Sequence, residues 1–287
     1  MAISPAHKFG QLIGELLEEM FHAPLAAIAQ KHGLYLDFKH ARPARGNKVK
    51  VNWADSKGNS HDLDYVLEHG GSENVVGTPK AFIETAWRRY TKHSKNKAQE
   101  MQGAIVPIAD THSEHHPFLG AAVGGVYTET SLQQLRSHGF TVFYISYASM
   151  VAAFAEVGID ASFDEDTSDF AMKTKVAAYK KLKPPGKAAI IKALIATHKD
   201  EYAAFFDSLV VSLTRCLLRI SIAALHGTTI EVVTAADAID FIEKYDEKQT
   251  VDGFVRYEVN VRYSNGDKIT GEFEDKTTAV VFLRGIR

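Results

Sequence analysis

The chain has 287 residues with ordinary apolar and charged fractions and a formal net charge of −2 at pH 7. This length predicts one large α/β domain or one and a half ordinary ones, with ample apolar residues for a core. A single cysteine, Cys216, excludes a disulfide framework and suits a reducing cytoplasm. The first residues lack the layout of a signal peptide, and charges interrupt the apolar segment 207–225, so we expect no membrane association.

The first half of the chain predicts alternating helices and strands. Apolar residues at helical spacing predict a first helix over residues 5–32. The elements that we expect after it, in chain order, are strands at 34–38 and 48–53, a turn at 55–59, a returning strand at 62–68, a loop at 70–79, a strand at 81–84, a helix from Ala86, strands at 104–108 and 119–128, a helix at 131–139, a strand at 140–147 and a helix at 148–157. This alternation indicates an α/β fold with a mixed central sheet flanked by helices.

The second half has a different character. An acidic stretch at 158–169 is followed by a run of lysines around the sequence KPPGK at 183–187, the best candidate for a boundary. We therefore expect a core over 1–183 and a largely helical subdomain over 184–287, with long helices between 187 and 245. The turn sequence SNGD predicts a hairpin at the C-terminal end.

Three acidic residues in the first half fall at predicted strands. Asp62 and Asp64 share one face of an extended segment, because side chains alternate along a strand, and Glu84 closes the apolar run that precedes the next helix. Carboxylates that meet at adjacent strand ends form an oxygen-only site of the kind that Mg²⁺ prefers. We expect these three residues to be its ligands.

The segment after Glu84 is unusually basic. Between residues 80 and 100, only Glu84 and Glu100 balance the cations. An unbalanced basic helix beside a metal site fits the phosphates of DNA, although a solvated helix face has the same composition. The cations that we expect to contact DNA are Arg88, Arg89 and Lys97 in this segment, and Arg42, Arg45 and Lys48 in the loop before the second strand.

The chain has one acid on a predicted hairpin strand, a second acid on the next strand, and then a helix. This arrangement resembles the core of PD-(D/E)xK nucleases. Within that superfamily the chain most resembles type II restriction endonucleases, over residues 61–147 and more loosely over 5–147. The resemblance implies Mg²⁺-dependent, sequence-specific hydrolysis of double-stranded DNA, no nucleotide cofactor, and location in a bacterial cytoplasm. Because palindromic sites have two-fold symmetry, it also implies a homodimer, for which the apolar helices of 188–245 offer an interface.

The resemblance assigns roles to individual residues. Asp64 matches the first metal-binding acid and Glu84 the second, whereas Ala86 stands at the position of the lysine. Some members of the superfamily carry that cation, or one acid, on the following helix, which implies Lys92 or Lys95 as the cation and Glu100 as a helix-borne acid. The open alternatives are a structure-specific nuclease with the same core and a catalytically silent DNA-binding protein, which Ala86 would suit.

Overall fold

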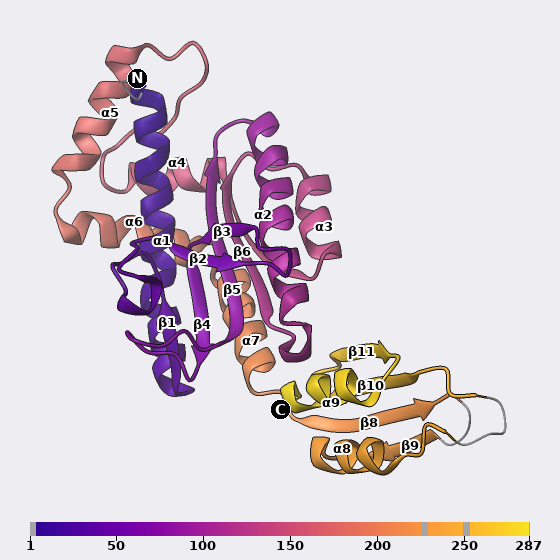
Figure 1. Cartoon of the computed structure of the whole chain (residues 1–287). Helices are drawn as coiled ribbons and strands as arrows, with labels where there is room; N and C mark the ends of the chain where they lie inside the picture. The colour runs from indigo at the N-terminus through magenta and orange to yellow at the C-terminus, as the bar shows by residue number, and fades with distance from the viewer. Residues whose placement is uncertain (1–3, 226–228, 249–252, 287) are drawn as a thin grey trace. The chain divides into compact units, whose positions relative to one another are not determined.

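A mixed five-stranded sheet forms the centre of the first half of the chain, as the alternation of elements predicts (Figure 1). Its strands, in spatial order, are β1 (Leu34–Asp37), β4 (Tyr65–His69), β5 (Thr78–Arg88), β6 (Phe118–Gly125) and β7 (Phe140–Ser146). β5, β6 and β7 run parallel, and the other neighbours are antiparallel. Helices flank this sheet, so the expected α/β class is confirmed.

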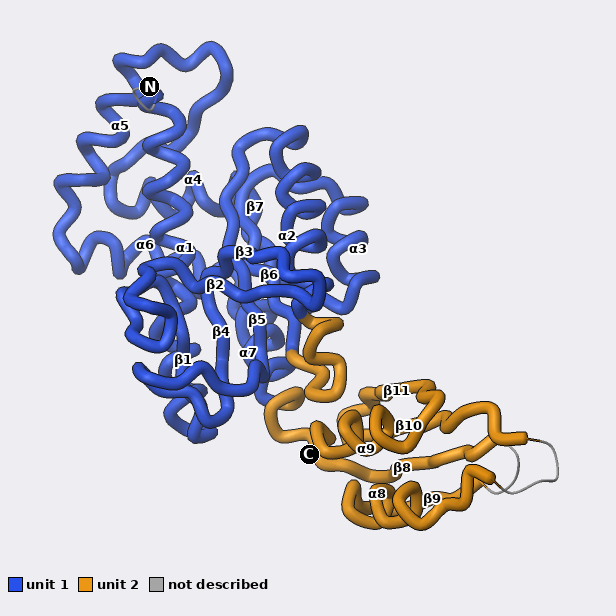
Figure 2. Tube along the Cα trace, viewed as in Figure 1, with its two compact units in different colours: residues 1–108, 118–210 blue, residues 109–117, 211–287 orange. Residues whose placement is uncertain are grey.

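The computed structural model describes residues 4–225, 229–248 and 253–286. The chain forms two compact units (Figure 2). Unit 1 comprises Met1–Ile108 and Phe118–Val210, and unit 2 comprises Ala109–Pro117 and Val211–Arg287. The sequence predicted a boundary near 183, but the KPPGK segment joins two helices that both belong to unit 1.

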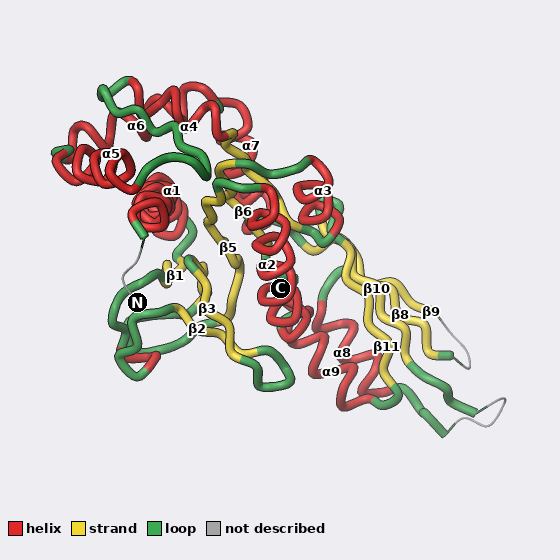
Figure 3. Tube along the Cα trace, turned by 90° about the horizontal axis from the view of Figure 1, so that it is seen from above, coloured by secondary structure: helices red, strands yellow, loops and turns green. Residues whose placement is uncertain are grey.

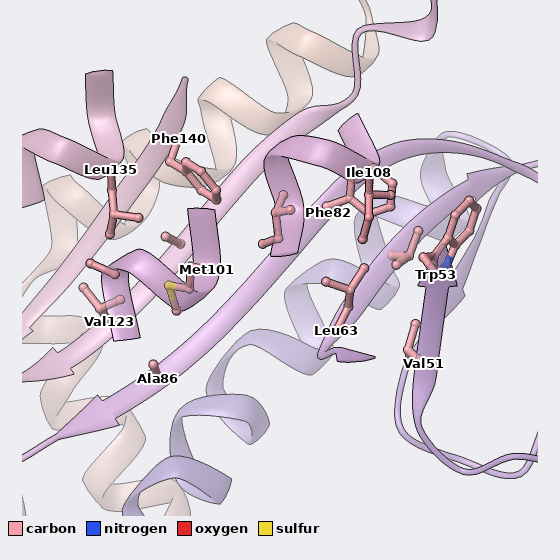
Figure 4. Close-up of a cluster of buried hydrophobic side chains, with 14 of the residues drawn as sticks. Val51, Trp53, Leu63, Phe82, Ala86, Met101, Ile108, Val123, Leu135 and Phe140 are labelled. Atoms are coloured by element: carbon pink, nitrogen blue, oxygen red, sulfur yellow. The ribbon is translucent and has the colours of Figure 1, made fainter. Parts of the chain in front are cut away.

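Helices cover both faces of the unit 1 sheet (Figure 3). On one face, side chains of α2, α3 and the sheet form an apolar cluster. Within this cluster, Met101 of α2 lies near Val123 and Ala86 of the sheet (Figure 4). On the other face, Phe21 of α1 packs against Phe143 of β7 and Phe205 of α7. The helices of this unit, in chain order, are α1 (Pro5–Lys31), α2 (Thr91–Thr111), α3 (Glu129–Ser137), α4 (Tyr147–Ala155), α5 (Asp169–Lys181), α6 (Pro184–Thr197) and α7 (Lys199–Leu213).

Two predicted boundaries around α2 are wrong. β5 continues to Arg88, so the helix begins at Thr91 rather than at Ala86. The expected strand at 104–108 forms the last turns of α2 instead, because Ile105 and Ile108 continue the helical spacing of the buried residues Ala98 and Met101. A short apolar run of this length fits either a strand or a buried helix.

Unit 2 contains a four-stranded antiparallel sheet in the order β11-β10-β8-β9, with a core shared with two helices. Its elements are β8 (Leu217–Ala224), β9 (Thr229–Val232), α8 (Ala235–Lys244), β10 (Tyr257–Tyr263), β11 (Lys268–Phe273) and α9 (Lys276–Gly285). The chain thus passes twice through a strand–strand–helix unit. The predicted terminal hairpin is confirmed as β10–β11, whereas the predicted helical run to 245 is wrong over β8 and β9. The alternation of the buried residues Ile220, Ile222 and Ala224 suits a strand with one covered face.

Candidate functional site

Asp64 lies where the chain leaves one sheet and enters another. The strand predicted for 62–68 divides there: β3 (Ser60–Leu63) pairs with β2 (Val51–Ala54) in a separate two-stranded sheet, and β4 pairs with β1 and β5. Oδ2 of Asp64 accepts hydrogen bonds from the backbone N–H of Thr85 at 2.7 Å and from its hydroxyl at 2.8 Å. Asp64 is thereby fixed against the residue that follows Glu84.

Glu84 lies within β5 and is only 8% exposed. Its Oε1 accepts a hydrogen bond from Nζ of Lys97 at 3.0 Å. Its Oε2 is buried and has no hydrogen-bond partner among the described residues. A buried carboxylate oxygen without a partner is costly, so this atom is well placed to bind an added cation.

Lys97 is the helix cation that reaches Glu84, whereas Lys92 and Lys95 are exposed on α2. The expectation that Lys92 or Lys95 replaces the missing strand lysine is thus not supported by the geometry. Glu84 and Ala86 face the same side of β5, where Ala86 belongs to the apolar cluster with α2. Because α2 covers that side, a lysine of the helix can approach Glu84.

The pKa values of both acids reflect burial and mutual repulsion. Burial, and secondly the charge of Asp64, raises the pKa of Glu84 to about 8, against the opposing effect of Lys97. Burial also raises the pKa of Asp64, although the hydrogen bonds from Thr85 act in the opposite direction. One lysine therefore does not fully compensate two neighbouring carboxylates, and a divalent cation would favour their ionised forms.

The described residues offer at most two carboxylates, Asp64 and Glu84, to a metal ion at this site. In the described parts of the chain, no group of three or more His, Cys, Asp or Glu side chains is arranged to hold a metal ion. Mg²⁺ retains several of its waters and is commonly bound through only one or two carboxylates. Asp64 and Glu84, with its unpartnered Oε2, meet that requirement.

An open cavity of about 810 Å³ gives access to this pair. Besides the two acids and Lys97, its charged lining comprises Glu15, Glu18, Lys39, Arg88 and Arg89, and two histidines, His7 and His93, also line it. Glu18, on α1, has a raised pKa because of burial and the nearby charge of Asp64. Lys39 belongs to the basic loop 39–48, which the sequence already offers for DNA contact. Thr85 gives no such signal in the sequence, because only the folded chain brings it beside Asp64.

Asp62 and Glu100 do not join Asp64. Asp62, on β3, accepts hydrogen bonds from Lys50 at 2.5 Å and Asn52 at 3.2 Å, and its side chain is 47% exposed. The expectation that Asp62 and Asp64 share one strand face is wrong, because the strand breaks between them. Glu100 is exposed and lies 3.9 Å from Nζ of Lys97. Asp62 and Glu100 instead line a smaller cavity, whose lining also includes Glu84 and Lys97.

Arg42 and Arg45 stabilise the loop that carries them. Arg42 is fully buried, with ion pairs of 2.7 Å to both Asp37 and Glu68. Nη2 of Arg45 donates to Asp37 at 3.1 Å, and its side chain is almost fully covered. The expected DNA contacts by Arg42 and Arg45 are therefore wrong, since two buried carboxylates require these cations. Lys48 is exposed, and its contact with DNA stays a prediction.

The two arginines at the end of β5 line the large cavity. Nη1 of Arg88 donates to the carbonyl of Trp87 at 2.8 Å. Arg89 donates to the carbonyl of Phe163 at 2.6 Å, and its guanidinium lies 3.9 Å from the centre of the Tyr147 ring. Arg89 is held against neighbouring segments, so its guanidinium is pre-positioned at the cavity wall. The contact of Arg88 and Arg89 with DNA stays a prediction.

Comparison with known proteins gives no match to a family model, to a curated protein or to a solved structure. None of the helices in the described residues is both long enough and apolar enough to span a bilayer. The geometry of the site is therefore the basis for the function proposed below.

Proposed function

We propose that the protein is a Mg²⁺-dependent endonuclease that cleaves double-stranded DNA at specific sequences, as a type II restriction enzyme of a bacterial cytoplasm. The observation that carries the proposal is that Asp64, Glu84 and Lys97 line one open cavity, with Lys97 hydrogen-bonded to Glu84 and Asp64 hydrogen-bonded to Thr85. An acid that directly precedes β4, an acid on the neighbouring β5 and one lysine are the groups that the resemblance to PD-(D/E)xK nucleases requires. Lys97 supplies the cation that is missing at Ala86.

Each residue has a distinct role in this proposal. Asp64 and Glu84 would hold Mg²⁺, which when bound would activate water and stabilise charge on the leaving oxygen. Thr85 positions Asp64 through its two hydrogen bonds. Lys97 places a positive charge beside Glu84, where it can stabilise the negative charge that develops on the reacting phosphate.

Acids and cations balance in the cavity lining, and its cations offer contacts to a polyanionic substrate whose metal would offset the acids. Arg88, Arg89 and Lys39 line the cavity, and Lys92 and Lys95 are exposed on the helix that delivers Lys97. Such cations neutralise phosphates along a backbone, and their contribution falls steeply with salt. Homodimerisation on a palindromic site is part of the proposal and follows from the symmetry of such sites.

The proposal is tested by incubating the protein with long unmethylated DNA and Mg²⁺, with an EDTA control. We expect discrete fragments whose mapped ends share one short sequence, because a restriction enzyme cleaves only where its site occurs. Nicks or cleavage at flaps would instead indicate a structure-specific nuclease. Intact DNA with a clear gel shift would indicate a DNA-binding protein without catalytic activity.

A further inference from the structure

The segment between Asp169 and Asp200 contains eight lysines and no acidic residue. It forms α5, the KPPGK turn and α6 within unit 1 (Figure 1). Four of these lysines cluster in sequence where α5 ends and α6 begins, and we call them the α5–α6 lysine cluster: Lys180, Lys181, Lys183 and Lys187. The function proposed above does not use them.

No described carboxylate forms an ion pair with any lysine of the cluster. Lys180, Lys181 and Lys183 are exposed, and Lys187 is half-buried with its Nζ 5.5 Å from the centre of the Tyr179 ring. Lys175, by contrast, pairs with Asp160 at 2.6 Å. The cluster therefore presents uncompensated positive charge at the surface of unit 1.

Helix electrostatics explain only half of the cluster. Lys180 and Lys181 lie in the last turn of α5, where the helix dipole favours cations. Lys183 is the N-cap of α6 and makes no capping hydrogen bond, and Lys187 lies just beyond the first turn. Cations at a helix N-terminus are unfavourable, and that turn contains no acid to offset them. A bound anion would offset the repulsion between Lys183, Lys187 and the positive end of the α6 dipole, which no acid in that turn offsets.

The chemistry of the cluster favours a phosphate backbone over a membrane. An interfacial helix inserts large apolar side chains beside its cations. The exposed large hydrophobic residue of this segment, Phe170, lies ten residues before Lys180 on the same helix, about 15 Å away along the helix axis. Lysine is a compact, strongly hydrated point charge that contacts phosphates without reading bases.

We propose that the α5–α6 lysine cluster binds the phosphate backbone of duplex DNA independently of sequence. This inference rests on the proposed nuclease function and adds a second contact surface to it. The substrate is then a duplex long enough to engage both the cleavage site and this cluster. Short duplexes that fill only the cavity would bind more weakly and with a smaller dependence on salt.

The test compares two triple variants in a Glu84→Gln background, which should bind DNA without cleaving it. One carries Lys180→Gln, Lys181→Gln and Lys183→Gln, and the control removes the same charge through Lys31→Gln, Lys57→Gln and Lys268→Gln, which are also exposed. Affinities for a long and a short duplex are measured over a series of salt concentrations. Because every altered side chain is exposed, thermal melts should be unchanged.

We expect the cluster variant to lose affinity for the long duplex. The slope of the logarithm of the binding constant against the logarithm of the salt concentration should fall in magnitude by about one for each lysine that contacts a phosphate. The control variant should keep the parent slope. Equal slopes for parent and cluster variant would overturn the inference while leaving the nuclease proposal intact. Loss of binding to anionic phosphatidylserine vesicles, with DNA binding unchanged, would overturn it in favour of a membrane surface. Absence of DNA binding by the parent itself would overturn both proposals.

Discussion

Glu84→Gln is expected to abolish Mg²⁺-dependent cleavage while preserving DNA binding. The amide keeps the size of the side chain but removes the negative charge that would hold the metal, and Oε2 has no other partner among the described residues. The rate should fall by about 10³-fold or more, since even loss of a hydrogen-bond partner to a metal ligand costs 10- to 100-fold. Single-turnover cleavage and gel shift on the same DNA measure the two properties separately.

Glu100→Gln provides the matched control for that variant. It makes the same chemical change on an exposed carboxylate that also lies near Lys97. We expect its cleavage rate to stay close to that of the parent protein. If Glu100→Gln were as inactive as Glu84→Gln, the helix-borne acid of the sequence prediction would be the true ligand, and the assignment of Glu84 would be wrong.

Lys97→Met is expected to produce the second largest loss, about 10²- to 10³-fold in the cleavage rate, as for other groups that stabilise charge in the transition state. The variant also leaves Glu84 without its cation, so the pKa of Glu84 should rise further and disfavour the ionised form. Single-turnover rates at saturating Mg²⁺ and DNA distinguish this effect from weak binding. Lys97→Arg should recover part of the activity, because the positive charge remains.

Lys92→Met and Lys95→Met are the controls on the same helix. Both side chains are exposed and should affect DNA affinity far more than the cleavage rate. The sequence interpretation favoured one of these two lysines as the catalytic cation. A rate loss confined to Lys92→Met or Lys95→Met would restore that interpretation and contradict the role of Lys97.

The structure brings Lys97 to Glu84 rather than Lys92 or Lys95, and this difference from the sequence prediction has a physical origin. Counting from a helix start at Ala86 placed Lys92 and Lys95 within reach of Glu84. The structure shows that β5 runs to Arg88 and that the helix begins at Thr91, which changes the lysines that can reach back. Strand ends depend on pairing with neighbours, here β6 up to Gly125, and such pairing is absent from local sequence patterns.

Burial of polar residues was equally hard to predict from sequence. The sequence neighbours of Arg42 are basic and polar, as in an exposed loop. Its partner Glu68 lies 26 residues away and forms a buried ion pair with it only in the folded chain. The helix over 5–31 and the hairpin β10–β11 were predictable, because their periodicity and turn chemistry are local. That Asp64 and Glu84 lie close together was also predictable, since each lies beside or within an apolar strand, whereas their binding of a metal stays a prediction.

Calorimetric titration of Mg²⁺ into the metal-free protein, with Asp64→Asn as the comparison, measures whether Asp64 and Glu84 bind the metal. The pKa of Glu84 is raised from 4.5 to about 8, so near neutral pH this carboxyl holds a proton that bound Mg²⁺ must displace. We expect Mg²⁺ binding to release a proton, which is detected by repeating the titration in buffers of different ionisation enthalpy. Affinity should rise with pH and level off above about 8, and Asp64→Asn should abolish binding. Absence of Mg²⁺ binding by the parent protein, or binding that Asp64→Asn leaves unchanged, would contradict the account.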